Sequence, residues 1–546
     1  MKERIMQILR ELVACESVSY SAKENTASQF VYDFLKSIPY FKENPEQFGK
    51  CLIPNDAYGR FAVYGLVLGK KKDTVILSGH TDVVSTEAYG EAEPLAFDVG
   101  KELEMKLASM NLDERARKDM ESGEWIWGRG VADMKGGDAL NMALTEKYAE
   151  EAVKGTLEGS VLFMAVPDEE SYSAGIRSGI EAVKDLKARY DLNCKILVCT
   201  EPAAEMGDNQ VMSLGTVGKL MPVVITQGKV AHVGHCFNGI SGLNMLAGVY
   251  QRTNGSLDFS DEFEGEATMP PTWSNMRDMK ITYDASLPYR GYGYFTVLNL
   301  STTPDEVMGK LKNICIEVFE EEVKKLNDTY QTFKTMNKFH TKEKLEYETC
   351  VMTFEELCND LKKKDAAGFQ EFYNRIYQEA DEKVVSGKLN FPSATVFLMD
   401  QVLNFADIKN PLILIGLTPP YYPATHSDMI EGKENFGTKI YEYVKKLSEE
   451  KYGQGLVYEN YFMGISDNSY TSLPPFNFEK LTKSIPMWGK LYSLNFKTIE
   501  EISIPSILYG PVAREYHQWT ERVNKRSLLE VMPNTLDAIV KYVWSI

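Results

Sequence analysis

Short apolar runs that end at polar residues recur along the first two hundred residues of the chain. Residues 74–77 (TVIL), 161–167 (VLFMAVP) and 195–202 (KILVCTEP) are rich in β-branched or other apolar side chains, as are strands buried inside a parallel sheet. Residues 136–152 and 174–190, which lie between them, carry apolar side chains at helical spacing. Strands that alternate with helices predict an α/β sheet, in which functional groups gather at the carboxyl ends of the strands.

The pattern changes after Gly215. The expected elements there, in chain order, are a strand at 218–232, a helix at 239–253, a strand at 292–301, a helix at 304–326 and a strand at 411–423. We therefore predict a smaller α+β domain at 215–422, with a charged helical insertion at about 327–409. It interrupts a first domain made of residues 1–214 and 423–546, which resumes with a helix and another buried strand.

The composition narrows the class of protein. The 546 residues include 60 Lys or Arg and 78 Asp or Glu, and the net charge of −18 would repel nucleic-acid phosphates and an anionic membrane surface. The eight Cys form no CxxC pair, which indicates reduced thiols in a cytoplasmic protein. The first residues form an amphipathic helical pattern rather than a signal peptide, and no apolar run approaches the roughly 18 residues of a membrane span. We predict neither nucleic-acid nor membrane partners.

Residues that could bind a metal stand where the predicted strands end or helices begin. His80 and Asp82 follow the first strand with one residue between them, an arrangement in which a carboxylate can orient an imidazole. Asp133 stands between a glycine-flanked turn and a helix start, so that on its own it is as well explained as a helix cap. Each motif alone is weak evidence for a metal site.

Three adjacent acids, Asp168, Glu169 and Glu170, directly follow the second strand. Their mutual repulsion needs relief by a cation or by solvent, and a metal could bind one carboxylate and leave another free as a base. Glu201 follows the next strand, and His517 follows the last. The candidate ligands mix nitrogen and oxygen atoms, which suits zinc, with cobalt or manganese as substitutes; they are His80, Asp133, Glu170, Glu201 and His517. The alternative is a set of capping residues and solvated acids.

These segments resemble the co-catalytic zinc peptidase family that includes aminoacylase, glutamate carboxypeptidase and succinyl-diaminopimelate desuccinylase. The likeness extends from Glu11 through Val523. Its motifs, in the family's order, are SGHTDVV, GRGVADMKGG, PDEE, TEP and a closing GPxxxxxH with Glu521. The length and insertions are similar to the arginine-utilisation subgroup. The fold implied is a three-layer α/β/α catalytic domain with an inserted lid and dimerisation domain.

The resemblance also implies roles for the candidate residues. His80 and Glu201 would hold one zinc, Glu170 and His517 the other, and Asp133 would bridge both. Asp82 would orient His80, and Glu169 would be the general base that deprotonates a bridging water and passes the proton to the leaving amine.

The predicted lid carries its own family-like motif, GKVAHVGHCFNGISGLN. His232 matches the histidine that a dimer partner's lid supplies to stabilise the oxyanion, and Asn244 lies in the glycine-rich helix entry nearby. The resemblance therefore implies a homodimer. His235, His340 and His426 receive no role.

Two departures from the family pattern affect substrate binding. Asn299 stands where many relatives have an arginine that grips a substrate carboxylate, and Arg277 or Arg290 could substitute, although each is better explained as a solvated residue. The glycine-rich loop that borders the pocket reads GISDNS at 464–469 and keeps Asp467. Residues 103–124 read as an added helix.

The sequence thus predicts a two-domain metallohydrolase that cleaves the amide or peptide bond of a small N-acyl amino acid or a short peptide. A non-catalytic binding or regulatory protein that keeps the same scaffold is the alternative. The sequence does not favour an α/β-hydrolase with a serine nucleophile, because the chain has no GxSxG motif.

Overall fold

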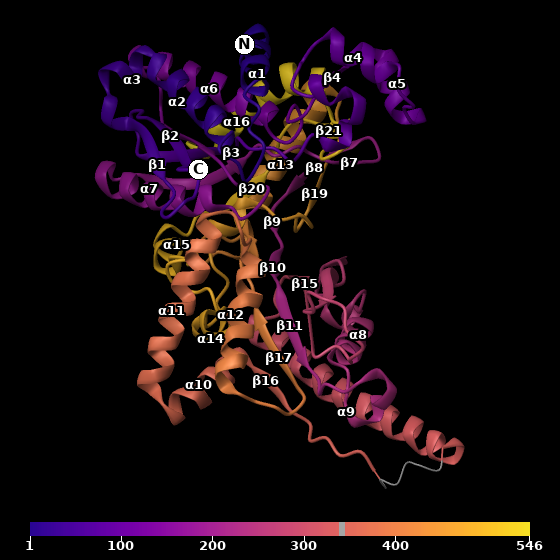
Figure 1. Ribbon diagram of the computed structural model, residues 1–546. Coiled ribbons are helices and arrows are strands. Elements are labelled where there is room, and N and C mark those ends of the chain that lie inside the picture. Colours follow the sequence, from indigo (N-terminus) through magenta and orange to yellow (C-terminus); the bar gives the residue numbers. More distant parts are fainter. Residues whose placement is uncertain (338–343) are drawn as a thin grey trace. The chain divides into compact units, whose positions relative to one another are not determined.

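The computed structural model of the chain describes residues 1–337 and 344–546 and divides into two compact units (Figure 1). Unit 1 comprises Met1–Val217, Pro423–Leu473 and Leu494–Ile546, and unit 2 comprises Gly218–Tyr422 and Pro474–Ser493. His340, to which the sequence assigned no role, lies outside the described residues.

The prediction that residues 423–546 all belong to the first domain is wrong for Pro474–Ser493, which packs in unit 2. The hydroxyl groups of Tyr373 and Tyr377 donate hydrogen bonds of 2.6 and 2.9 Å to the carbonyls of Pro486 and Met487. Such contacts depend on side chains far apart in the chain, so no local pattern marks this segment as part of unit 2.

Unit 1 is built on a nine-stranded sheet with the order β1-β2-β5-β3-β6-β20-β8-β19, to which β7 adds by pairing with β8. The strands are β1 (Phe48–Leu52), β2 (Phe61–Val67), β3 (Asp73–His80), β5 (Ser160–Val166), β6 (Asn193–Cys199), β7 (Glu205–Met206), β8 (Asn209–Ser213), β19 (Leu456–Glu459) and β20 (Ser506–Leu508). The central strands β5, β3, β6 and β20 run parallel. Every residue of β5 is buried, which accounts for its unbroken apolar sequence.

Helices cover both faces of this sheet. One face shares a single apolar core with α1 (Lys2–Val13), α2 (Glu24–Ser37), α6 (Lys135–Val153), α13 (Phe436–Tyr452) and α16 (Met532–Val543). Helix α7 (Ala174–Tyr190) packs on the opposite face, as Figure 1 shows. The predicted three-layer α/β/α fold is confirmed.

Two glycines at the start of α6 allow close packing, Gly137 against the end of β6 and Gly136 against the turn that precedes the helix. A Cβ atom at Gly137 would lie 2.2 Å from the carbonyl oxygen of Thr200, and one at Gly136 would lie 2.4 Å from that of Val131. Any larger residue would push the helix away. The turn before α6, which carries Asp133, is therefore held beside the strand end that carries Glu201.

Unit 2 contains a six-stranded sheet with the order β10-β15-β11-β17-β16, to which β14 adds beside β15. Its strands are β10 (Gly218–Leu220), β11 (Pro222–Gln227), β14 (Thr272–Asp278), β15 (Arg290–Asn299), β16 (Val351–Thr353) and β17 (Leu412–Leu417), and its longer helices are α8 (Gly242–Thr253), α9 (Pro304–Met336), α10 (Phe354–Lys364), α11 (Ala366–Val385) and α12 (Phe391–Ala406). The single strand expected at 218–232 is thus two strands, because Pro222 has no N–H group with which to continue the ladder.

The added helix expected at 103–124 is a pair of helices in unit 1, α4 (Lys101–Ala108) and α5 (Glu114–Ser122). The Asp113 side chain caps α5 by accepting a hydrogen bond from the Ala116 N–H group. Among the described residues, none of the helices combines the length and the apolar character that a membrane span requires.

Candidate metal centre and active site

The five predicted ligands come from five separate segments of unit 1 and converge in space. His80 is the last residue of β3, while Glu170 and Glu201 follow β5 and β6. Asp133 lies in the turn before α6, and His517 lies in the loop between β21 (Ala513–Arg514) and β22 (Arg522–Asn524). Because β3, β5 and β6 are parallel neighbours, their carboxyl ends bring these side chains to one edge of the sheet.

The ligands form two overlapping groups. His80 Nε2 lies 3.0 Å from Asp133 Oδ1 and 3.4 Å from Glu201 Oε1. His517 Nε2 lies 3.1 Å from Asp133 Oδ2 and 3.1 Å from Glu170 Oε2. Within each group, the possible ligand atoms lie within 4.8 Å of one another. Asp133 belongs to both groups, with one carboxylate oxygen directed to each.

The donor set fits divalent cations. Three carboxylates share a site in which the Asp133, Glu170 and Glu201 side chains are at most 12% exposed. Oε1 of Glu170 is buried and finds no hydrogen-bond partner among the described residues. Burial alone would lower the pKa of His80, but the Glu201 charge and the hydrogen bond with Asp133 raise it well above its ordinary value. The site thus favours positive charge, which bound metal ions would supply.

Asp82 connects the first strand to the two acids after β5. His80 Nδ1 lies 3.0 Å from the backbone carbonyl oxygen of Asp82 and 3.6 Å from its carboxylate, so the carbonyl is the group that orients the imidazole. The carboxylate instead accepts hydrogen bonds from the backbone N–H groups of Glu169 (3.1 Å) and Glu170 (3.2 Å) and from the Ser19 hydroxyl (2.7 Å). Asp82 therefore fixes the segment that carries the predicted base.

The three adjacent acids escape their mutual repulsion by diverging. Asp168 turns away, accepts a 2.6 Å hydrogen bond from Arg60 and caps the start of α7 through the Ala174 N–H group. Glu170 joins the second ligand group. Burial raises the pKa of Glu169 well above its ordinary value, and the charges of Glu201 and other nearby acids add to this. Arg60 is buried and gave no signal in the sequence.

A buried ion pair holds the turn that contains Asp133. Glu521 Oε1 accepts hydrogen bonds from the backbone N–H groups of Ala132 (3.1 Å) and Asp133 (3.2 Å), and its other oxygen pairs with Arg129. Arg129 also donates to the backbone carbonyl of His517 at 3.2 Å. Glu521 lies in one of the sequence motifs, and Arg129 lies in the GRG sequence of another, but the local sequence assigns Arg129 no role.

The predicted substrate-side residues are divided between the units. Asp467 belongs to unit 1, where it is buried, and burial raises its pKa to about 7. His232, Asn244 and Asn299 belong to unit 2. Asn299 is 1% exposed and donates a 2.7 Å hydrogen bond to the Thr302 carbonyl, so its side chain supports the turn before α9.

The two arginines considered as substitutes for a carboxylate-gripping residue also lie in unit 2. Arg290 is buried and donates to Gln227, Asp400 and Asn404, with distances of 2.6–2.9 Å. These internal contacts occupy its guanidinium group, so Arg290 does not fit that role. Arg277 is exposed on β14.

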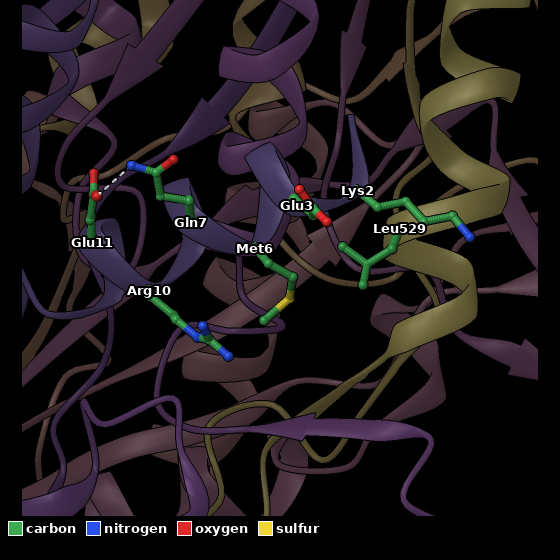
Figure 2. A pocket seen from close by; sticks show the side chains of 7 residues that line it. All are labelled: Lys2, Glu3, Met6, Gln7, Arg10, Glu11 and Leu529. Atoms are coloured by element: carbon green, nitrogen blue, oxygen red, sulfur yellow. Dashed lines mark hydrogen bonds between the residues drawn. The ribbon is translucent and has the colours of Figure 1, made fainter.

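The surface hollow drawn in Figure 2 is separate from these ligand groups. Its volume is about 470 Å³, and seven residues from α1 and the segment before α16 line it: Lys2, Glu3, Met6, Gln7, Arg10, Glu11 and Leu529. Gln7 donates a 3.0 Å hydrogen bond to Glu11. None of the lining residues is a predicted ligand or base, so we assign this hollow no catalytic role.

Comparisons with known proteins identify the family of the chain. The model of the family described as peptidase family M20/M25/M40 matches residues 76–473. The uncharacterized protein YqjN of Bacillus subtilis (strain 168) is 30% identical over 550 residues, which cover 99% of this chain and 97% of YqjN. Protein RocB of the same organism is 27% identical over 97% of this chain and 93% of RocB.

A solved structure shares the fold. The dipeptidase Dug1p of Saccharomyces cerevisiae superposes with a TM-score of 0.53 and 12% identity, covering 100% of this chain and 96% of that one. The family match spans more than half of the chain and includes four of the five predicted ligands. The chain therefore belongs to peptidase family M20/M25/M40 and is a metallohydrolase of the peptidase type.

Proposed function

We propose that this metallohydrolase cleaves the amide bond of a small N-acyl amino acid or a short peptide, with two zinc ions that cobalt or manganese can replace. The observation that carries the proposal is the pair of overlapping ligand groups with Asp133 in both. The resemblance to the arginine-utilisation subgroup supports arginine or amino-acid catabolism as the setting.

His80 and Glu201 would hold one ion, Glu170 and His517 the other, and Asp133 both. Bound metal ions would polarise the scissile carbonyl and lower the pKa of water. The chain itself supplies the proton transfer. A Glu169 carboxylate oxygen accepts a proton from the attacking water and delivers it to the nitrogen of the leaving amine, so the broken amide yields a carboxylic acid and an amine. Glu169 belongs to neither ligand group, so its carboxylate is not committed to a metal and can take and release a proton.

His232 is proposed to stabilise the oxyanion in the site of a partner subunit. Its Nδ1 atom accepts a 3.0 Å hydrogen bond from the Gly234 N–H group, which leaves Nε2 as the protonated nitrogen of the neutral ring. An Nε2–H group on an exposed loop is a suitable donor to a developing negative charge. Asn244, exposed in the first turn of α8, is proposed to contact substrate with it, and Asp467 to border the pocket in unit 1.

Mixing two inactive variants tests the action of His232 across subunits. We expect His232→Ala and Glu169→Gln homodimers to be nearly inactive, whereas exchanged heterodimers have one complete site. A statistical 1:1 mixture should therefore recover about a quarter of wild-type turnover if the enzyme is a symmetric dimer. Activity is measured after subunit exchange. The control is each variant assayed separately, without exchange. No recovery of activity after verified subunit exchange would count against a cross-subunit site.

The function itself is tested by elemental analysis of protein purified without chelator, together with a hydrolysis screen. The screen compares N-acyl amino acids that differ in acyl group, N-acylated arginine among them, with dipeptides, before and after chelation and after zinc is restored. We expect about two metal ions per chain and hydrolysis that chelation abolishes and zinc restores. Protein that takes up no metal and cleaves neither class after reconstitution would favour the non-catalytic binding protein.

A further inference from the structure

The position of His517 depends on the loop that carries it. The loop joins β21 to β22, and both Glu515 (φ 52°) and His517 (φ 67°) have left-handed backbone conformations. Such conformations are costly for residues other than glycine unless surrounding contacts fix them. The His517 side chain is 52% exposed, so close packing does not hold it. Arg129 holds the backbone carbonyl of His517, and further contacts act through the base of this hairpin.

Two arginines at that base bind one carboxylate, Asp119 of helix α5. Arg514 Nη1 donates to both Asp119 oxygens at 2.7 and 2.8 Å, and Arg522 Nε donates to Oδ2 at 2.7 Å. Asp119 is 8% exposed and Arg522 is fully buried. The Arg514 guanidinium lies 4.3 Å from the ring centre of Trp125, and that of Arg522 lies 4.9 Å from that of Trp127. One acid thus clamps the two strands that lead into and out of the His517 loop.

Arg522 carries this constraint into the loop itself. Its Nη1 atom donates to Glu515 Oε2 at 2.7 Å and to the Thr520 carbonyl at 2.9 Å. The Thr520 hydroxyl also donates to Glu515. Asp119, Arg522 and Glu515 therefore form a continuous chain of contacts that ends two residues before His517. His80 and Glu201 have no part in this chain, because they stand at the ends of sheet strands. Asp133, which belongs to both ligand groups, is held by Glu521, the residue before Arg522.

We propose that Asp119 is a positioning residue for His517, and so sets the affinity of the metal site formed by Asp133, Glu170 and His517. The inference rests on the proposed two-metal function. Without the Asp119 carboxylate, Arg522 would be a buried cation whose nearest remaining acid is Glu515, and moving it toward water would shift the hairpin. Mutation of a residue that holds a metal ligand in place typically lowers the metal affinity by about 10- to 100-fold. The effect should fall mainly on the site that contains His517, because only that site takes a ligand from this loop.

The test is titration of demetallated protein with Co²⁺, followed by visible absorption, for Asp119→Asn and Asp119→Ala. Asp119→Asn keeps an acceptor oxygen without the charge and guards against a folding defect in the alanine variant. Glu121→Gln, at an exposed position of the same helix, is the matched control. His517→Ala and His80→Ala identify which Co²⁺ equivalent and which spectral component belong to each ligand group.

We expect wild type and Glu121→Gln to bind two equivalents. In Asp119→Asn, the Co²⁺ equivalent whose binding depends on His517 should bind about 10- to 100-fold more weakly than in the wild type, with an altered spectrum. The affinity for the equivalent that depends on His80 should stay within about threefold of the wild-type value. Unchanged binding of both equivalents would overturn the inference, as would equal weakening of both, which indicates a general loss of structure. Fewer than two equivalents in the wild type would overturn the two-metal function and this inference with it.

Discussion

Glu169→Gln is expected to lower kcat by about 10²- to 10⁴-fold while the metal content stays at the wild-type level. Glutamine has nearly the same shape but cannot take a proton from water at neutral pH. The backbone N–H group of Glu169 still donates to Asp82, so the segment keeps its place. Glu169 belongs to neither ligand group, and its replacement should leave both metal sites intact. Elemental analysis and steady-state kinetics on the same preparation measure the two quantities.

The neighbouring acid provides the matched control. Glu170→Gln changes the adjacent residue in the same way, but Glu170 Oε2 lies 3.1 Å from His517 Nε2 in the second ligand group. We expect this variant to lose metal as well as turnover. The contrast separates a proton carrier from a ligand. If Glu169→Gln kept kcat within about tenfold of wild type, Glu169 would not be the general base.

The parallel sheet and the convergence of its polar ends follow from local sequence patterns. Strands β3, β5 and β6 are buried on both faces, so their apolar runs are unbroken and easily recognised. His80, Glu170 and Glu201 come at or just after the ends of these runs, and parallel pairing alone then brings them together. Sequence reasoning could therefore anticipate the neighbourhood of these side chains, although not their distances.

The contacts that hold the ligands in place could not be predicted in this way. Arg129 and Glu521 are 392 positions apart, and Arg522 and Asp119 are 403 apart. Each of these charged residues looks like a surface residue in its local sequence, and only the folded chain buries it beside its partner. The same limit applies to Asp82, whose carboxylate binds the Glu169 and Glu170 N–H groups across 87 and 88 positions.

Asp133→Ala is expected to abolish binding of both metal ions, the largest effect of any single substitution in the site. Asp133 Oδ1 lies near His80 and Oδ2 near His517, so its removal leaves only two protein ligands in each group. Metal sites of this kind need at least three protein ligands. The loss of affinity should exceed the roughly 10- to 100-fold effect of a residue that only positions a ligand. Metal content after dialysis, and titration of the demetallated variant, measure it.

Asp138→Asn tests whether the loss of metal is specific to a ligand or follows from replacing any buried acid near the start of helix α6. Asp138 is fully buried in the first turns of the same helix, α6, and belongs to neither ligand group. Burial raises its pKa to about 8, so at neutral pH the carboxyl is mostly protonated and its replacement by an amide changes little charge. This variant should retain two metal ions. An Asp133→Ala protein that is folded and still binds both ions would show that Asp133 is not the shared ligand, because each site would then be complete without it.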